Sequence, residues 1–169
     1  AQGELTAVKA KRARVAARMG GHRGGEVASA TALETLRISI LEPNAEALRA
    51  AAEAANRAVF DQSLTDPELA GMGTTLCGIA LVRDHEGRPS IGIVNVGDSR
   101  VSLLRGGQFR QLTLDHSLVE TMVRGGQISA DEAATHPGRN VLTRALGIEP
   151  DIEVGLFSEP VLEGDRYLL

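Results

Sequence analysis

Two stretches in the first part of the chain carry apolar residues at helical spacing. In residues 27–40 they recur every three or four positions, which predicts an amphipathic helix after a glycine-dense loop. A second apolar stripe runs from about Asn44 to Ser63, and Pro43 before it suits the start of a helix. Asp66-Pro67 then marks a break. We therefore expect two helices in this part of the chain.

The period of the pattern changes from about residue 73 onward. The runs TTLCGIALVR and SIGIVNV are apolar and are separated by the turn-prone segment 84–89, so they predict two buried antiparallel strands. Residues 101–104 and 109–112 flank Gly106-Gly107, whose backbone freedom suits the turn of a second hairpin. The middle of the chain is therefore expected to form a β-meander.

Two short helices are expected to interrupt the strand region. Ser117 is placed to cap the segment LVETMVRGG, and Ser129 with Glu132 forms a capping-box pattern. Three later apolar runs predict further strands, at 141–147, 152–157 and 165–169. Helices, strands, short helices and strands in this order indicate an α+β fold with antiparallel sheet and helices on its outer faces.

The composition fits one globular domain. The 169 residues are 43% hydrophobic but only 2% aromatic, so Val, Leu, Ile and Ala must fill the core. The formal net charge of −4 argues against nucleic acid or an anionic membrane as a partner. Cys77 is the only cysteine, and no apolar run approaches the roughly 18 residues that span a bilayer. These features predict a cytoplasmic protein with no membrane segment in this chain.

The first 18 residues differ from the acidic remainder. Five basic residues lie there among alanines: Lys9, Lys11, Arg12, Arg14 and Arg18. One interpretation is a basic arm for nucleic acid or lipid. We favour a solvated helix or tail, because no aromatic residues are interleaved with the charges.

Three polar motifs could carry chemistry. In the glycine-dense loop, Gly20 and Gly21 could offer backbone N–H groups to an anion ahead of a helix. Gly97-Asp98-Ser99-Arg100 follows a strand, where its oxygens could bind Mg²⁺ or Mn²⁺. Asp115-His116-Ser117 could hold a ligand or a base. Each motif also has a structural interpretation: a flexible connector, a self-capping Asp-Ser turn and a helix cap.

Taken in order, these motifs resemble those of the PPM-type (type 2C) metal-dependent Ser/Thr protein phosphatases, in particular the bacterial branch. The matching blocks stand in the family order and span about 150 residues. They are MGGHRGGEVAS at 19–29, GMGTT at 71–75, GDSR at 97–100, LTLDHS at 112–117, HPGRNVLTRALG at 136–147 and GDRYLL at 164–169.

The resemblance implies an antiparallel β-sandwich flanked by helices, in α-β-β-α layers. It also implies two or three Mn²⁺ or Mg²⁺ ions at one end of the sandwich, where a metal-activated water attacks the phosphomonoester directly. Asp98 resembles the carboxylate that reaches a third, weaker metal, and His22 resembles the loop histidine that assists proton transfer. The implied partners are phosphorylated protein substrates and a cognate Ser/Thr kinase.

The sequence departs from the family where the two main metals are held. The family has Ala-Asp-Gly-Met-Gly-Gly there, and this chain has AARMGG at 16–21. Ala17 has no side-chain oxygen to donate, and Arg18 brings a positive charge to the place of two divalent cations. The family's upstream Asn-Glu/Gln-Asp motif and its later Ser-Asp-Gly motif are not found either. We therefore expect little or no metal binding and turnover from this chain.

These observations lead to a hypothesis about domains and function. Residues 1–18 form a basic leader outside the family pattern, and residues 19–169 form a partial PPM-type domain, truncated at both ends. The abrupt change at Met19 predicts a partial or out-of-frame reading of such a domain. The expected function is hydrolysis of phosphoserine and phosphothreonine, inactive in this chain as it stands. The alternative is a non-catalytic pseudophosphatase that binds a phosphoprotein or a kinase.

Overall fold

The computed structural model describes residues 5–8, 13–18, 23–40 and 44–169. Its larger sheet has five strands in the order β1-β2-β3-β4-β7, and every neighbouring pair is antiparallel. The smaller sheet has the order β6-β5-β8 and is also antiparallel. The strands of the larger sheet are β1 Leu5–Val8, β2 Ala13–Arg18, β3 Thr75–Arg83, β4 Pro89–Val96 and β7 Gly155–Pro160. Those of the smaller sheet are β5 Ser102–Arg105, β6 Gln108–Gln111 and β8 Arg166–Leu168.

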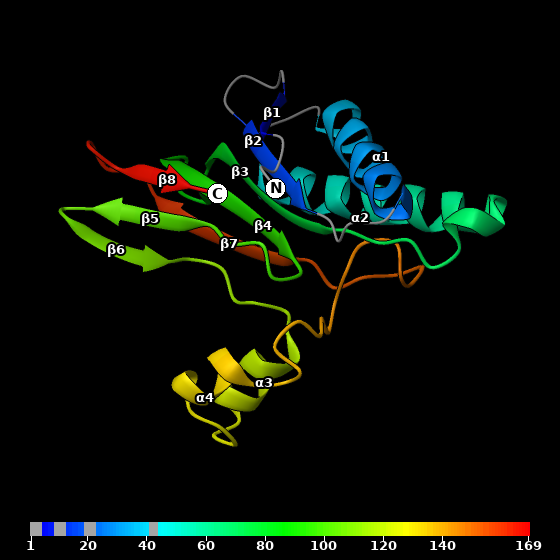
Figure 1. Ribbon diagram of the computed structural model, residues 1–169. Coiled ribbons are helices and arrows are strands. Elements are labelled where there is room, and N and C mark those ends of the chain that lie inside the picture. The colour runs from blue at the N-terminus through cyan, green and yellow to red at the C-terminus, as the bar shows by residue number, and fades with distance from the viewer. Residues whose placement is uncertain (1–4, 9–12, 19–22, 41–43) are drawn as a thin grey trace.

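Two long helices, α1 (Arg23–Ser39) and α2 (Ala45–Thr65), pack against each other and cover one face of the larger sheet (Figure 1). Asn44 caps α2, because its side-chain oxygen accepts a hydrogen bond from the Ala47 N–H at 2.8 Å. A short 3₁₀ helix, η1 (Pro67–Leu69), then leads from α2 to β3. No helix in the described ranges is long and apolar enough to cross a membrane.

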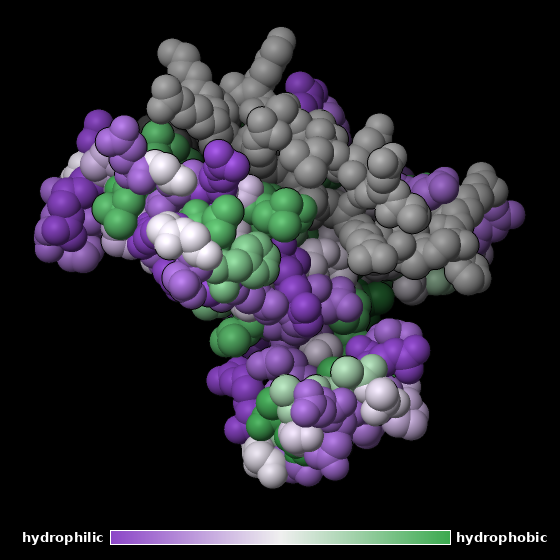
Figure 2. All heavy atoms as spheres, turned by 60° about the vertical axis from the view of Figure 1, so that its left-hand side comes forward, coloured by the Kyte–Doolittle hydropathy of each residue, from purple (hydrophilic) through white to green (hydrophobic). Residues whose placement is uncertain are grey.

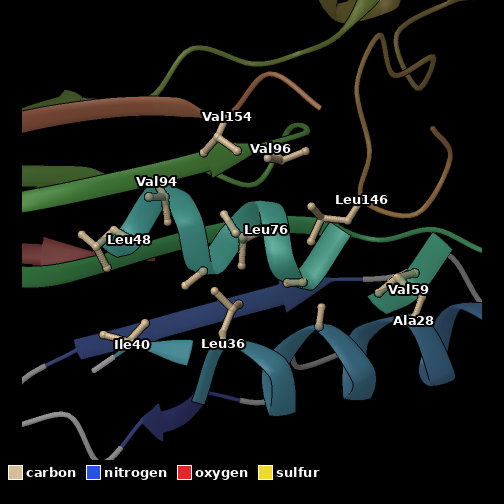
Figure 3. Packing of buried hydrophobic residues seen from close by; sticks show 14 of the residues in the cluster. Ala28, Leu36, Ile40, Leu48, Val59, Leu76, Val94, Val96, Leu146 and Val154 are labelled. Carbon is tan, nitrogen blue, oxygen red and sulfur yellow. The ribbon is translucent and has the colours of Figure 1, made fainter. Parts of the chain in front are cut away.

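The central strands β3 and β4 of the larger sheet carry buried residues on both faces, because successive side chains along a strand point to opposite faces. On the helix side, Leu76 and Val94 pack with residues of α1 and α2, and Figure 3 shows these side chains pointing toward one another. On the other side, Cys77 and Ile93 belong to a second buried cluster, which also includes Val101 next to β5. The described residues therefore form a helix layer and two sheet layers, and the α+β antiparallel fold is confirmed.

The remaining helices, α3 (Leu118–Arg124) and α4 (Ala130–Thr135), form a small unit that projects from the body of the molecule (Figures 1 and 2). The predicted caps are confirmed. Ser117 accepts from the Glu120 N–H, and Ser129 and Glu132 form the reciprocal capping box.

Two predictions of secondary structure were wrong, and a third was shifted. The basic stretch was expected to be a solvated helix or tail, but residues 5–8 and 13–18 are strands, and β2 pairs with the edge of β3. Without β2, the side of β3 opposite β4 would be a sheet edge with unpaired backbone groups, and such an edge favours pairing with another strand. Residues 141–147 form no strand, because Leu142 and Leu146 make isolated bridges to different segments. The run 152–157 was expected to be a strand, but β7 begins at Gly155 and ends at Pro160.

Candidate functional site

The ends of three neighbouring strands meet at one end of the larger sheet. In the register of β2 and β3, Ala17 pairs with Leu76 and Arg18 with Thr75. Leu76 in turn pairs with Val96, the last residue of β4, and Gly97 follows. Positions 17 and 18 therefore lie at the same sheet end as the GDSR turn. Gly20, Gly21 and His22 lie outside the described residues, and their roles stay predictions.

The GDSR turn is packed closely against the start of β3. Gly97 has a φ of +97°, and a Cβ atom at this position would lie 2.4 Å from Cγ2 of Thr75. Only glycine fits this combination of backbone angle and contact. The hydroxyl groups of Ser99 and Thr75 are joined by a hydrogen bond of 2.7 Å. The turn is thus held against β3 by contact and by hydrogen bonding.

The three polar side chains of the turn diverge, although the sequence suggested that they could share one site. Asp98 is exposed to solvent. Arg100 forms a bidentate ion pair with Asp115, with Nε 2.9 Å from Oδ1 and Nη2 2.5 Å from Oδ2. This hydrogen-bonded carboxylate raises the pKa of Arg100. Asp98, the one carboxylate of the GDSR turn, is therefore the side chain of this turn that is open to a ligand.

His116 joins the GDSR turn to the segment that follows α4. The Gly97 N–H donates to Nδ1 of His116 at 3.1 Å, and the His116 N–H donates to the Gly97 carbonyl at 2.9 Å. The His116 carbonyl accepts from the Thr143 N–H at 2.9 Å. Burial and then the nearby Arg144 guanidinium lower the pKa of His116, which favours the neutral ring. The sequence identified this histidine as a possible base or ligand, but not these contacts.

The segment after Arg144 is fixed to α2 by a residue that the sequence did not single out. Asn56 is buried in α2, and its side-chain oxygen accepts from the Gly147 N–H at 2.8 Å. Its amide group donates to the carbonyls of Glu149 at 2.9 Å and Pro150 at 3.1 Å. No sequence signal could reveal these contacts, since an asparagine in an alanine-rich helix is an ordinary surface residue.

A pocket of about 700 Å³ opens beside this sheet end. Its walls are the start of β3, including Thr74 and Thr75, and residues from the segments 140–145 and 148–153. Arg144 and Glu153 both line it and form an ion pair of 2.5 Å. The pocket adjoins the GDSR turn through Thr75, whose hydroxyl contacts Ser99.

The described residues at this sheet end do not form a metal centre. Within the part of the chain that the structure describes, no group of three or more His, Cys, Asp or Glu side chains could hold a metal ion. Asp98 stands alone as a carboxylate on the GDSR turn, and Ala17 supplies no side-chain oxygen. A pair of divalent cations needs several oxygen ligands, including bridging ones.

Known proteins with this fold and similar sequences are bacterial phosphatases. The chain is 39% identical over 163 residues to the serine/threonine phosphatase stp of Listeria welshimeri, which covers 92% of this chain and 63% of that protein. The crystal structure of the PPM Ser-Thr phosphatase MsPP from Mycobacterium smegmatis, in complex with cacodylate, superposes with a TM-score of 0.81. It is 35% identical, and the match covers 98% of this chain and 74% of that one.

A second similar structure contains metal. It is the catalytic domain of the serine/threonine protein phosphatase PstP in complex with two manganese ions, with a TM-score of 0.78 and 34% identity. The match covers 98% of this chain and 73% of that chain. No protein-family model matches the chain. The chain spans less than two thirds of the length of the Listeria phosphatase that it matches.

Proposed function

Because the chain belongs to the PPM-type family of bacterial Ser/Thr protein phosphatases, we propose that the complete protein hydrolyses phosphoserine and phosphothreonine in phosphorylated proteins. The relatives that match over most of this chain are named phosphatases, which supports a hydrolase. They give no support to a non-catalytic binding role. A cognate Ser/Thr kinase would supply the phosphorylated substrates, and a cytoplasmic location is consistent with Cys77 being the single cysteine, which can form no disulfide within the chain.

The complete protein would use Mn²⁺ or Mg²⁺, and the manganese-bound relative supports this requirement. When bound, such ions supply an activated water and neutralise phosphate charge. The residues of this chain do not fit a two-metal centre, so we propose that the chain alone has little or no turnover. Asp98 remains as a candidate ligand for a weaker metal, and His22, Gly20 and Gly21 remain candidates for proton transfer and phosphate contact.

One observation carries the proposal about metal binding. The strand register sets Ala17 and Arg18 beside Leu76 and Thr75, at the same sheet end as Asp98. Neither Ala17 nor Arg18 has a side-chain oxygen, so these two positions cannot supply the carboxylate ligands that a pair of metal ions would need. The proposed division into a basic leader, residues 1–18, and a partial catalytic domain, residues 19–169, rests on the sequence pattern, whereas β1 and β2 of the leader lie in the larger sheet of that domain.

The test is Mn²⁺ binding by isothermal titration calorimetry, together with hydrolysis of p-nitrophenyl phosphate and a phosphothreonine peptide. The unmodified chain should show no turnover with Mn²⁺. The double substitution Ala17→Asp and Arg18→Gly should strengthen Mn²⁺ binding by about tenfold or more, because it adds a carboxylate and removes a positive charge. The matched control is Ala16→Asp together with Arg18→Gly, since neighbouring strand residues face opposite sides of the sheet.

The outcomes separate the two parts of the proposal. Turnover by the unmodified chain, or equal Mn²⁺ binding by the two double variants, would contradict the account of the metal site. The phosphatase assignment would fail if a longer form with the family's carboxylate motifs restored bound Mn²⁺ and still hydrolysed no phosphopeptide.

A further inference from the structure

His116 is the point where three segments distant in sequence are joined. The first is the GDSR turn, whose Gly97 exchanges two hydrogen bonds with His116. The second is the start of the α3–α4 unit, because Ser117 caps α3 directly after His116. The third is the segment that returns from α4, where the Thr143 N–H donates to the His116 carbonyl. One half-buried residue therefore holds the turn, the unit and its return segment together.

The hydrogen bond from Gly97 also decides the tautomer of the imidazole. An amide N–H can donate only to a ring nitrogen with a free lone pair, so Nδ1 must be unprotonated. In the neutral ring the proton then lies on Nε2. Nε2 is 3.5 Å from Nη1 of Arg144, a donor that would favour an unprotonated Nε2. The Gly97 N–H is closer to its ring nitrogen, at 3.1 Å, so the tautomer follows the stronger contact at Nδ1.

Apart from the contact of the turn with Thr75, Gly97 depends on hydrogen bonds for its position. Its positive φ is an unusual backbone conformation, and its carbonyl also faces the Asn95 amide at a long 3.4 Å. The next residue is Asp98, the exposed carboxylate of the turn. A change in the orientation of the Gly97 peptide would therefore move Asp98 relative to Thr75 and the pocket beside it.

We propose that His116 is a positioning residue for the turn that carries Asp98. Its Nδ1 fixes this turn while the ring proton is on Nε2. Its backbone ties the turn to residue 143 at the base of the α3–α4 unit. Only the importance of Asp98 rests on the proposed phosphatase function. The positioning role itself is a property of this chain and can be measured without catalysis.

Two isosteric substitutions separate this role from general packing. In His116→Asn the side-chain oxygen can take the place of Nδ1, whereas in His116→Gln it reaches the place of Nε2. The Gly97 N–H exchange rate is measured by NMR. We expect the Asn variant to stay close to the unmodified chain, and the Gln variant to exchange roughly fivefold faster or more, since one hydrogen bond is lost. The Asp98 and Ser99 amide signals should shift in the Gln variant only.

His136→Gln is the matched control, because Nδ1 of His136 also accepts a backbone N–H, from Gly138, but within its own loop. It should leave Gly97 exchange unchanged. A long-range ¹H–¹⁵N spectrum of the unmodified chain tests the tautomer directly, even where a variant fails to fold. A protonated Nδ1 at neutral pH would overturn the proposal, as would equal effects of the Asn and Gln substitutions on Gly97. If the complete protein proved not to be a phosphatase, the exchange rates and the tautomer measured in this chain would still decide the positioning role.

Discussion

Asn56 shows how a single buried side chain fixes a loop more than ninety residues away in sequence. All of its side-chain hydrogen-bonding groups engage backbone groups of residues 147–150, which lie between and within the segments 140–145 and 148–153 that line the pocket. Backbone groups in a loop have no partner strand, so a side chain must satisfy those that are buried. Asn56 therefore links the long helix layer to the functional end of the sheet.

We predict that Asn56→Ala lowers the free energy of unfolding by about 2–4 kcal/mol, because the buried Gly147 N–H loses its acceptor and two carbonyls lose a donor. Urea denaturation measures the change. Arg57→Ala is the control: it removes an exposed ion pair between α2 and Asp151 in the following loop, and should cost less than about 1 kcal/mol. Equal losses in the two variants would show that Asn56 is not the main attachment.

At the scale of elements, the GDSR turn depends on a glycine for two separate reasons. Gly97 combines a positive φ with a close approach to Thr75, whereas Gly87 has a similar φ of +78° and open space around its Cα atom. The two positions therefore distinguish backbone strain from steric contact.

Gly87→Ala should destabilise the protein by about 1–2 kcal/mol, the cost of a left-handed conformation for an L-residue. Gly97→Ala should cost a further 1–3 kcal/mol or so, because the added methyl group would overlap the Thr75 side chain. Thermal and urea unfolding of both variants provide the measurement. If the two alanine variants were equally stable, the tight packing of the turn on β3 would be refuted.

Elements with local signals could be predicted from the sequence, and elements with distant partners could not. Asn44, Ser117 and Ser129 stand at helix starts because their side chains satisfy N–H groups close by in the chain. The segment 141–147 has the apolar character of a strand, but its hydrogen bonds go to Thr74 and His116 rather than to one neighbouring strand. Likewise, the sequence located Asp98 and His116 but could not show that Arg100 pairs with Asp115.

At the scale of the whole molecule, a partly buried ion network joins the two sheets. Arg105 in β5 contacts Glu159 in β7 at 2.8 Å and Asp165 before β8 at 2.7 Å. The Asp165 side chain is only 3% exposed. Its hydrogen bonds with Arg105 lower the pKa of Asp165 to about 2, and the same pair raises the pKa of Arg105.

This network predicts a defined pH dependence. The pKa of Asp165 is about 2 in the folded chain and roughly 3.9 in an unfolded one, so its contribution is complete above about pH 4 and is lost as the pH falls toward 2. Asp165→Asn should therefore destabilise the protein at pH 6 and make little difference near pH 2. The measurement is the free energy of unfolding in urea across this range. Glu163→Gln, an exposed neighbour, should show no such dependence, and a parallel effect in both variants would contradict the prediction.

The base of the α3–α4 unit has a consequence for how such a molecule can change over evolution. The Leu118 N–H donates to the Val141 carbonyl, and the Thr143 N–H donates to the His116 carbonyl, so the chain leaves the sandwich and re-enters it at adjoining points. Insertions or deletions between these points need not alter the path of any strand. This excursion can therefore diverge in length and surface chemistry while the scaffold beneath it stays the same.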